Sequence, residues 1–216
     1  MIKAIIFDAE GIVVDTESIW DKEQTLFLSR RGVVYQPDKV KYLVSGRSLK
    51  MSTEILFEIY GFQEKLEDAV NERKTTFQKF LEDEIEFICG FKDFFFKVKP
   101  YYKVCIATSL DVDNLTIIDK KLNLSSFFKE NLFSINDVGQ QSKPDPAIFL
   151  YAARKLKVEQ SNCLVIEDSP SGIEAAKKAG MRCIALSTTY PRHRLTKADF
   201  IYSRYEQIPI DQLSHF

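Results

Sequence analysis

The sequence predicts an α/β protein, an open parallel sheet with an all-helical unit inserted after its first strand. Three features support this prediction: short unbroken apolar runs, helical patterns that alternate with them, and a long helical stretch near the N-terminus. Strands that are buried on both faces read as continuous apolar runs rather than as alternating ones. Alternation of such runs with helical patterns is typical of a sheet covered by helices.

Five apolar runs are the expected strands. They span residues 4–7, 104–107, 163–166 and 183–186, with a weaker run at 132–135. Residues 113–122, 147–156 and 171–179 lie between or after these runs, and their composition and apolar spacing are typical of helices. The order of strands and helices therefore predicts a parallel sheet.

Residues 16–87 have a different pattern, with four helical segments and no convincing strand. The segments are expected at 18–31, 37–44, 49–60 and 63–84, and Gly32 and Gly61 stand where two of them end. We therefore predict an α/β core of residues 1–15 and 88–216 and a helical cap of residues 16–87.

The bulk composition excludes several classes of protein. The chain has 216 residues and a formal net charge of −1. It therefore lacks the net positive charge that would attract nucleic acid or an anionic membrane. No apolar run approaches the ~18 residues of a membrane span. The four cysteines are widely spaced, without a zinc-binding or redox pattern. We expect a cytoplasmic monomer that binds neither nucleic acid nor a membrane.

Polar residues follow three of the expected strands directly. They are Asp8 and Glu10, then Thr108 and Ser109, then Glu167 and Asp168. In an open parallel sheet, ligands bind outside the carboxyl ends of the strands. We therefore expect these side chains to meet along one edge of the sheet.

Four carboxylates in one place would repel one another strongly. A divalent cation with oxygen ligands would relieve the repulsion, and Mg²⁺, which keeps several waters and binds substrate phosphate, fits best. Lys143 supplies a second positive charge, just before the two prolines that suit the opening turn of the next helix.

Taken together, these residues resemble the haloacid dehalogenase superfamily, and within it the β-phosphoglucomutase-like phosphatases and mutases. The resemblance rests on four stretches, FDAEG at 7–11 continuing to DTE at 15–17, IATS at 106–109, KPDP at 143–146 with Phe149, and VIEDSPSGI at 165–173 with the alanines after it. The match covers nearly the whole chain. It implies a Rossmann-like core with a helical cap.

The resemblance also implies an enzyme that hydrolyses a small phosphorylated metabolite, such as a sugar phosphate. Asp8 would attack phosphorus and form an aspartyl-phosphate. Thr108 and Ser109 would bind the phosphoryl group, and Lys143 would neutralise its charge. Mg²⁺ would be held by Asp8, by the backbone carbonyl of Glu10, and by Asp168. Glu167 would be an added ligand or would support the others.

Glu10 departs from the family pattern, which has Asp at this position. That side chain serves as general acid to the leaving oxygen and then as base for water. The additional methylene moves the carboxylate by ~1.5 Å, and a misplacement of about 1 Å can cost on the order of a hundredfold in rate. We expect a slow enzyme, or one whose cap repositions the substrate to suit Glu10.

Two alternatives stay open beside the phosphatase. A sugar-phosphate mutase is disfavoured, because Trp20 replaces a histidine of the well-known mutase and Leu110-Asp111 replace its Ser-Lys pair. A weakly active or non-catalytic binding protein is supported by Glu10 alone. In the cap, Arg47 and Trp20 are candidate substrate contacts. The alternative for Arg47 is a solvated charge, which the sequence favours, and the alternative for Trp20 is packing within the cap.

Overall fold

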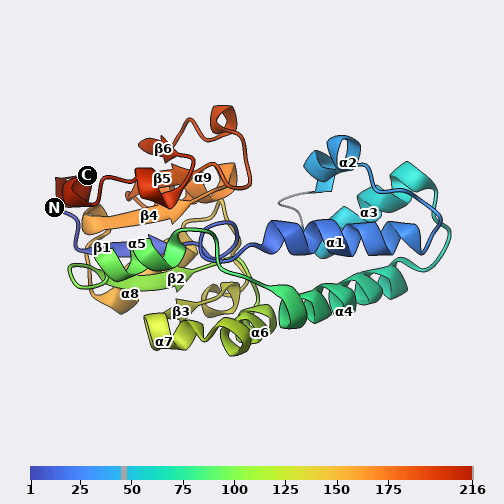
Figure 1. Cartoon of the computed structure of the whole chain (residues 1–216), viewed down its shortest axis with the longest axis horizontal. Coiled ribbons are helices and arrows are strands. Elements are labelled where there is room, and N and C mark those ends of the chain that lie inside the picture. Colours follow the sequence, from blue (N-terminus) through green and yellow to red (C-terminus); the bar gives the residue numbers. More distant parts are fainter. Residues whose placement is uncertain (45–47, 216) are drawn as a thin grey trace. The chain divides into compact units, whose positions relative to one another are not determined.

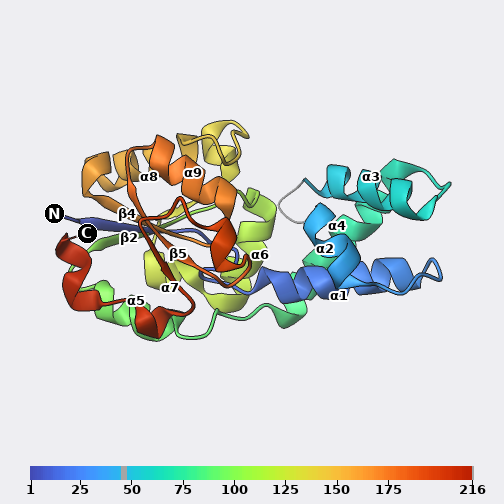
Figure 2. The ribbon, with the colours of Figure 1, turned by 90° about the horizontal axis from the view of Figure 1, so that it is seen from above.

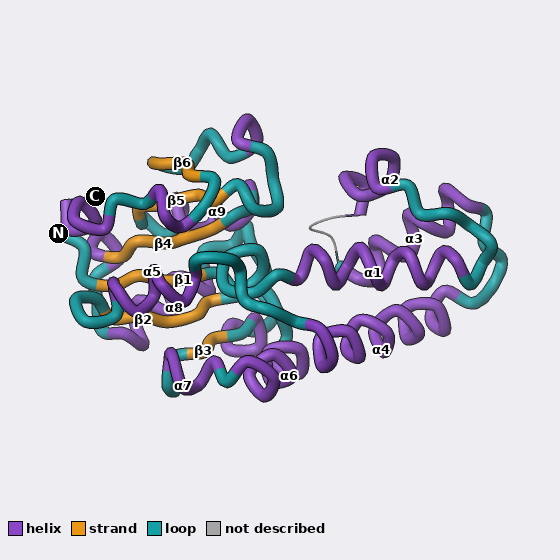
Figure 3. The backbone as a smooth tube through the Cα atoms, in the orientation of Figure 1, coloured by secondary structure: helices purple, strands orange, loops and turns teal. Residues whose placement is uncertain are grey.

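The computed structural model describes residues 1–44 and 48–215 and divides into two compact units. Met1–Asp15 and Ile85–Phe216 form the first, which we call the α/β unit, and Thr16–Glu84 form the second, the helical unit. Figure 3 shows that the strands lie in the α/β unit. No helix among the described residues combines the length and the apolar character that crossing a membrane demands.

The α/β unit contains a parallel sheet, as predicted (Figure 1). Within the described residues the sheet has six strands, β1 (Ala4–Phe7), β2 (Lys103–Ala107), β3 (Leu132–Phe133), β4 (Cys163–Glu167), β5 (Arg182–Leu186) and β6 (Phe200–Tyr202). Their order is β3-β2-β1-β4-β5-β6. Sequence analysis missed β6, a half-buried strand of three residues. It also made β3 too long, since only two residues pair with β2.

Helices cover both faces of this sheet (Figure 2). They are α5 (Phe91–Val98), α6 (Val112–Leu122), α7 (Leu124–Phe128), α8 (Ala147–Leu156) and α9 (Pro170–Lys178). Short 3-10 turns η1 (Ile135–Val138), η2 (Gln160–Asn162), η3 (Arg192–Arg194), η4 (Tyr205–Gln207) and η5 (Ile210–His215) complete the unit.

Strand β1 runs through the middle of the core. Its Ala4 and Ile6 side chains belong to the apolar cluster under α8 and α9. Phe7 points the other way, because successive strand residues face opposite sides. Its ring packs edge-on against Phe91 of α5 and Phe128 of α7, with centroids 5.8 and 5.9 Å apart. This two-sided burial explains why β1 reads as an unbroken apolar run.

The sheet order brings three strand ends together. Phe7, the last residue of β1, pairs with Ile106 of β2 on one side and with Ile166 of β4 on the other. The residues that follow these strands therefore leave the sheet at the same level. The crevice outside β1 and its neighbours is where an open sheet of this order binds its ligand.

The helical unit contains α1 (Thr16–Ser29), α2 (Pro37–Val44), α3 (Leu49–Tyr60) and α4 (Leu66–Glu84). The α2 and α3 helices have the predicted bounds. Ser48 caps the start of α3 by accepting a hydrogen bond from the backbone N–H of Met51, and Gly61 ends the helix in the left-handed conformation. The α1 helix begins two residues before the predicted start, and α4 begins three residues after it.

The second junction between the units lies three residues earlier than predicted. Residues 85–87 group with the α/β unit rather than with the cap. The backbone N–H of Asp15 donates to the Glu86 carbonyl at 3.0 Å, and Val14 forms an antiparallel bridge with Phe87. Backbone pairing of the outgoing and returning segments, which leaves no signal in the sequence, sets this boundary.

The buried face of α4 contains an arginine, which the spacing of apolar residues in the sequence did not predict. Buried residues follow a four-residue step through Ala69, Arg73, Phe77 and Leu81. The Arg73 side chain, 1% exposed, donates to both carboxylate oxygens of Glu23, the shortest bond being 2.7 Å. It also donates to the hydroxyls of Ser52 and Thr53, each at 3.2 Å. Arg73 thereby joins α1, α3 and α4 through one buried network.

Replacing Arg73 with Met should lower the free energy of unfolding by about 3–5 kcal/mol, because the buried Glu23 carboxylate would lose its partner. The matched control is Arg30→Met, which removes a half-exposed ion pair with Glu72 and should cost at most about 1 kcal/mol. The fluorescence of Trp20, the chain's single tryptophan, reports urea unfolding of this unit. Equal losses in the two variants would contradict a structural role for the Arg73 network.

Candidate active site

Three carboxylates meet at the carboxyl ends of β1 and β4. Asp8 follows β1, Glu167 ends β4, and Asp168 comes next. One oxygen from each lies within 4.8 Å of the others. All three residues are buried, with Asp8 6% exposed, Glu167 0% and Asp168 5%. The predicted convergence of these residues is therefore present in the fold.

Lys143 lies against two of these carboxylates. Its Nζ donates to Asp8 Oδ1 at 2.5 Å and to Glu167 Oε1 at 2.7 Å, and its side chain is only 6% exposed. The ammonium also lies 4.9 Å from the ring centroid of Phe149 on α8. A buried cation with two carboxylate partners and an aromatic neighbour is fixed in place before any ligand arrives.

The charges in this group shift one another's titration. Burial raises the pKa of Asp8 to about 6, although Lys143 opposes the shift. Burial, together with the charges of Glu167 and Asp8, raises the pKa of Asp168 well above its usual range. Burial would lower the pKa of Lys143, but the two carboxylates outweigh it and raise that pKa. The site therefore has more negative charge than one lysine neutralises.

Glu167 accepts hydrogen bonds from four donors. Its Oε1 accepts from Lys143, and its Oε2 accepts from the backbone N–H groups of Asp168 and Ser169 and from the Ser169 hydroxyl. A carboxylate has about two acceptor positions on each oxygen, so Oε2 is fully used and one position is left on Oε1 beside the Lys143 bond. The Glu167 side chain also fills the place of a Cβ at Gly172, which would lie 1.6 Å from Oε1. Glu167 thus orients Lys143 and the turn before α9.

Glu10 lies in the turn that follows Asp8 and is half-buried. The carbonyl of Ala9 accepts backbone bonds from Val13 and Val14, at 2.8 and 3.0 Å, and closes this turn. The Glu10 carboxylate is not part of the three-carboxylate group, so the predicted fourth negative charge does not join it. Gly11 has φ +68°, and a Cβ there would lie 1.9 Å from Asp168 Oδ2. Only glycine fits at this close approach.

Thr108 follows β2 directly and lies at the same edge of the sheet as Asp8. Its side chain is buried, and its hydroxyl oxygen accepts from the backbone N–H of Leu110 at 3.1 Å. A hydroxyl that accepts this bond still has one O–H with which to donate. Ser109 is half-buried beside it. Asp111 caps α6 by accepting from the backbone N–H of Asn114 at 2.8 Å.

Two residues near this site escaped sequence analysis. The Thr189 hydroxyl, in the loop after β5, donates to the Asp168 carboxylate. The buried Tyr205 donates its hydroxyl to the carbonyl of Ile12, in the turn after Asp8, at 2.8 Å. Neither residue lies in any of the four sequence motifs, and only the folded chain brings them to the turn and the carboxylates.

The two predicted cap contacts have different outcomes. Trp20 stacks on Phe77 within the helical unit, with ring centroids 3.7 Å apart and planes 19° apart. This contact gives Trp20 a packing role, and its binding of substrate remains a prediction. Arg47 and the neighbouring Gly46 lie outside the described residues.

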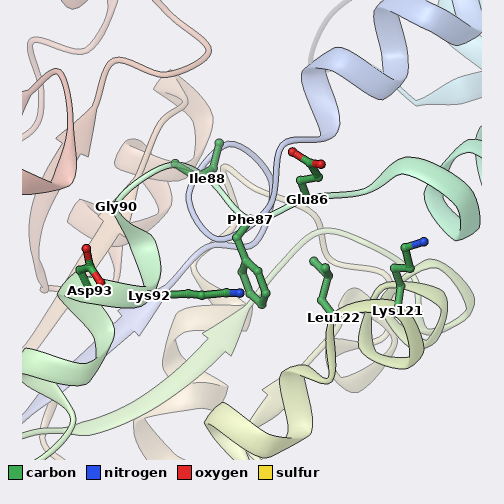
Figure 4. A pocket seen from close by; sticks show the side chains of 8 residues that line it. All are labelled: Glu86, Phe87, Ile88, Gly90, Lys92, Asp93, Lys121 and Leu122. Carbon is green, nitrogen blue, oxygen red and sulfur yellow. The ribbon is translucent and has the colours of Figure 1, made fainter.

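A cavity of about 550 Å³ lies elsewhere in the α/β unit (Figure 4). Its lining comes from the returning segment, the start of α5 and the end of α6, namely Glu86, Phe87, Ile88, Gly90, Lys92, Asp93, Lys121 and Leu122. The Lys92 ammonium lies 4.4 Å from the centroid of the Phe87 ring. None of the three carboxylates lines this cavity, so it is separate from the site described above.

The chain matches known proteins along most of its length. The family model of the haloacid dehalogenase-like hydrolases matches residues 5–186. The chain is 26% identical to the 6-phosphogluconate phosphatase of Escherichia coli over 83% of this chain and 80% of that protein. It is 29% identical to the phosphorylated carbohydrates phosphatase of Thermotoga maritima over 84% and 83% of the two chains.

A solved structure has the same fold. It is that of a haloacid dehalogenase-like protein from Agrobacterium tumefaciens, with a TM-score of 0.85 and 27% identity over 100% of this chain and 99% of that one. The resemblance drawn from four motifs is thereby confirmed. The chain belongs to the haloacid dehalogenase-like hydrolases.

Proposed function

We propose that this protein is a Mg²⁺-dependent phosphatase that hydrolyses a phosphomonoester of a small metabolite through an aspartyl-phosphate. One observation carries the proposal: the buried Asp8 carboxylate lies 2.5 Å from Lys143 and next to a second buried carboxylate, Asp168, at the ligand-binding edge of the sheet. Family membership supports hydrolysis, and these residues supply the chemistry.

Different residues of the chain act as nucleophile, as general acid and base, and as phosphoryl-binding groups. The Asp8 carboxylate attacks phosphorus in line and forms an acyl phosphate, while Glu10 protonates the departing oxygen. Glu10 then takes a proton from the water that releases phosphate. Lys143 and the Thr108 hydroxyl bind the oxygens of the phosphoryl group, on which negative charge is spread.

Mg²⁺ fits the residues present. Asp8 and Asp168 are the hard oxygen donors that this ion prefers. Burial and mutual repulsion raise the pKa values of both carboxylates, which supports a further positive charge between them. Asp8 and Asp168 would hold the ion together with the Glu10 carbonyl, and Glu167, which belongs to the same group of carboxylates, would be an added ligand or would support the others. When bound, the ion supplies charge neutralisation at the transferring phosphoryl group.

The relatives suggest the substrate class. Proteins named for 6-phosphogluconate and for phosphorylated carbohydrates match over most of this chain, and we propose a phosphorylated carbohydrate here. A mutase would need to grip a second phosphate. Asp111, whose carboxylate caps α6, offers negative charge where the mutase has a lysine. The cytoplasmic location and the monomeric state remain predictions from the sequence.

Replacing Asp8 with Asn should reduce Mg²⁺-dependent hydrolysis of an aryl phosphate by at least about 10³-fold, because the variant lacks the nucleophile. Chelation of Mg²⁺ should abolish the wild-type rate. Asp113→Asn is the matched control, since this carboxylate is exposed in the first turn of α6 and should leave the rate unchanged. Equal phosphate release by wild type, chelated wild type and Asp8→Asn would favour a binding protein instead.

The Glu10→Gln variant should lower kcat by about 10²–10⁴-fold, since general acid–base catalysis contributes this much. Glu10→Asp should raise kcat, by up to about a hundredfold, because it restores the shorter reach of the family's acid. Steady-state kinetics on the same aryl phosphate measure both effects. A fall in turnover in Glu10→Asp would show that the site is built around Glu10.

Mg²⁺ binding should weaken as pH falls below about 6. The pKa of Asp8 is raised to about 6 by burial, so below that pH a proton occupies the carboxylate that must hold the ion. The dissociation constant should rise about tenfold per pH unit there, and the raised pKa of Asp168 extends this dependence to higher pH. Calorimetric titration with Mg²⁺ between pH 5 and 8 measures it, and a flat profile would contradict the assignment.

A further inference from the structure

The loop after β5 contacts the carboxylate site through one side chain. Thr189 lies three residues beyond the end of β5 and donates its hydroxyl to the Asp168 carboxylate. Gly11, in the turn after Asp8, meets the same two side chains. A Cβ at Gly11 would lie 2.6 Å from Thr189 Oγ1 and 1.9 Å from Asp168 Oδ2. Three segments distant in sequence thus meet at the Asp168 carboxylate.

Asp168 needs such a partner for a physical reason. The torsion that turns an Asp carboxylate about its Cβ–Cγ bond has a broad minimum, so packing alone orients it poorly. Glu167, its neighbour, is held by four donors and faces Lys143. One bond from Thr189 would fix the orientation of Asp168 and leave acceptor positions for a cation. Partners of this kind determine how well a carboxylate binds metal.

We propose that Thr189 is a positioning residue of the cation site, which orients the Asp168 carboxylate so that it shares a divalent ion with Asp8. This inference rests on the proposed function, because it assumes that Asp8 and Asp168 hold the ion. Thr189 acts through Asp168 and does not itself touch the substrate. The loop after β5, which lies outside all four sequence motifs, thereby becomes part of the machinery of the site.

The test compares Thr189→Val, which keeps the shape and removes the hydroxyl, with Thr189→Ser, which keeps the hydroxyl. Thr188→Val is the matched control, because this neighbouring threonine is exposed. Each full-length protein, stripped of metal and free of substrate, is titrated with Mn²⁺, and free Mn²⁺ is followed by electron paramagnetic resonance. Thermal unfolding in chelator measures stability without the ion.

Thr189→Val should weaken Mn²⁺ binding about 10–100-fold, while Thr189→Ser and Thr188→Val stay within about threefold of wild type. Melting temperatures in chelator should be alike in all four proteins. Wild-type affinity in Thr189→Val would overturn the inference. So would equal losses in Thr189→Val and Thr189→Ser, or a loss in Thr189→Val matched by a lower melting temperature in chelator, since either would indicate simple packing.

Failure of the proposed function would look different. Asp168→Asn is titrated in parallel as the reference for a lost ligand. If wild type bound no Mn²⁺, or if Asp168→Asn bound it as well as wild type, the cation site itself would be wrong, and the inference would be overturned with it. Binding by wild type that Asp168→Asn loses and Thr189→Val retains would overturn only the role of Thr189.

Discussion

The contact of Lys143 with Asp8 and Glu167 is the interaction on which the rest of the site depends. A carboxylate as buried as Asp8 would otherwise take up a proton, because burial raises its pKa, and could not act as the proposed nucleophile. One ammonium at 2.5 Å offsets part of that cost, and Glu167 holds the ammonium in place from the other side. The remaining negative charge on Asp8 and Asp168 is what the proposed divalent ion would neutralise.

The two acidic residues at the end of β4 have different tasks although they are adjacent. Glu167 accepts four hydrogen bonds and behaves as a structural anion that aligns Lys143 and the turn before α9. Asp168 has Thr189 as a donor and lies against Gly11. The number of hydrogen bonds that each accepts, rather than residue type, distinguishes these two carboxylates. The glycines at 11 and 172 leave the space that both side chains require.

The helical unit also contains a buried ion pair, between Arg73 and Glu23, whose role is structural. Arg73 and Glu23 belong to a compact unit separate from the one that contains the acidic group. Their network, with Ser52 and Thr53, joins the helices α1, α3 and α4. A buried pair of this kind contributes little net stability compared with apolar packing, but losing one partner is costly. We infer that it fixes how α1, α3 and α4 align within this unit.

The sequence by itself determined the fold class, four of the strands nearly to the residue, and the residues Asp8, Thr108, Lys143, Glu167 and Asp168 at one edge of the sheet. It could do so because buried parallel strands leave continuous apolar runs, and because functional side chains follow them directly. Only the tertiary structure decided that Glu167 accepts from four donors, that the Glu10 carboxylate stays outside the group, and that Thr189 reaches Asp168. Those outcomes depend on contacts between segments far apart in the chain, and the pattern of residues along one segment carries no information about which partner will reach it.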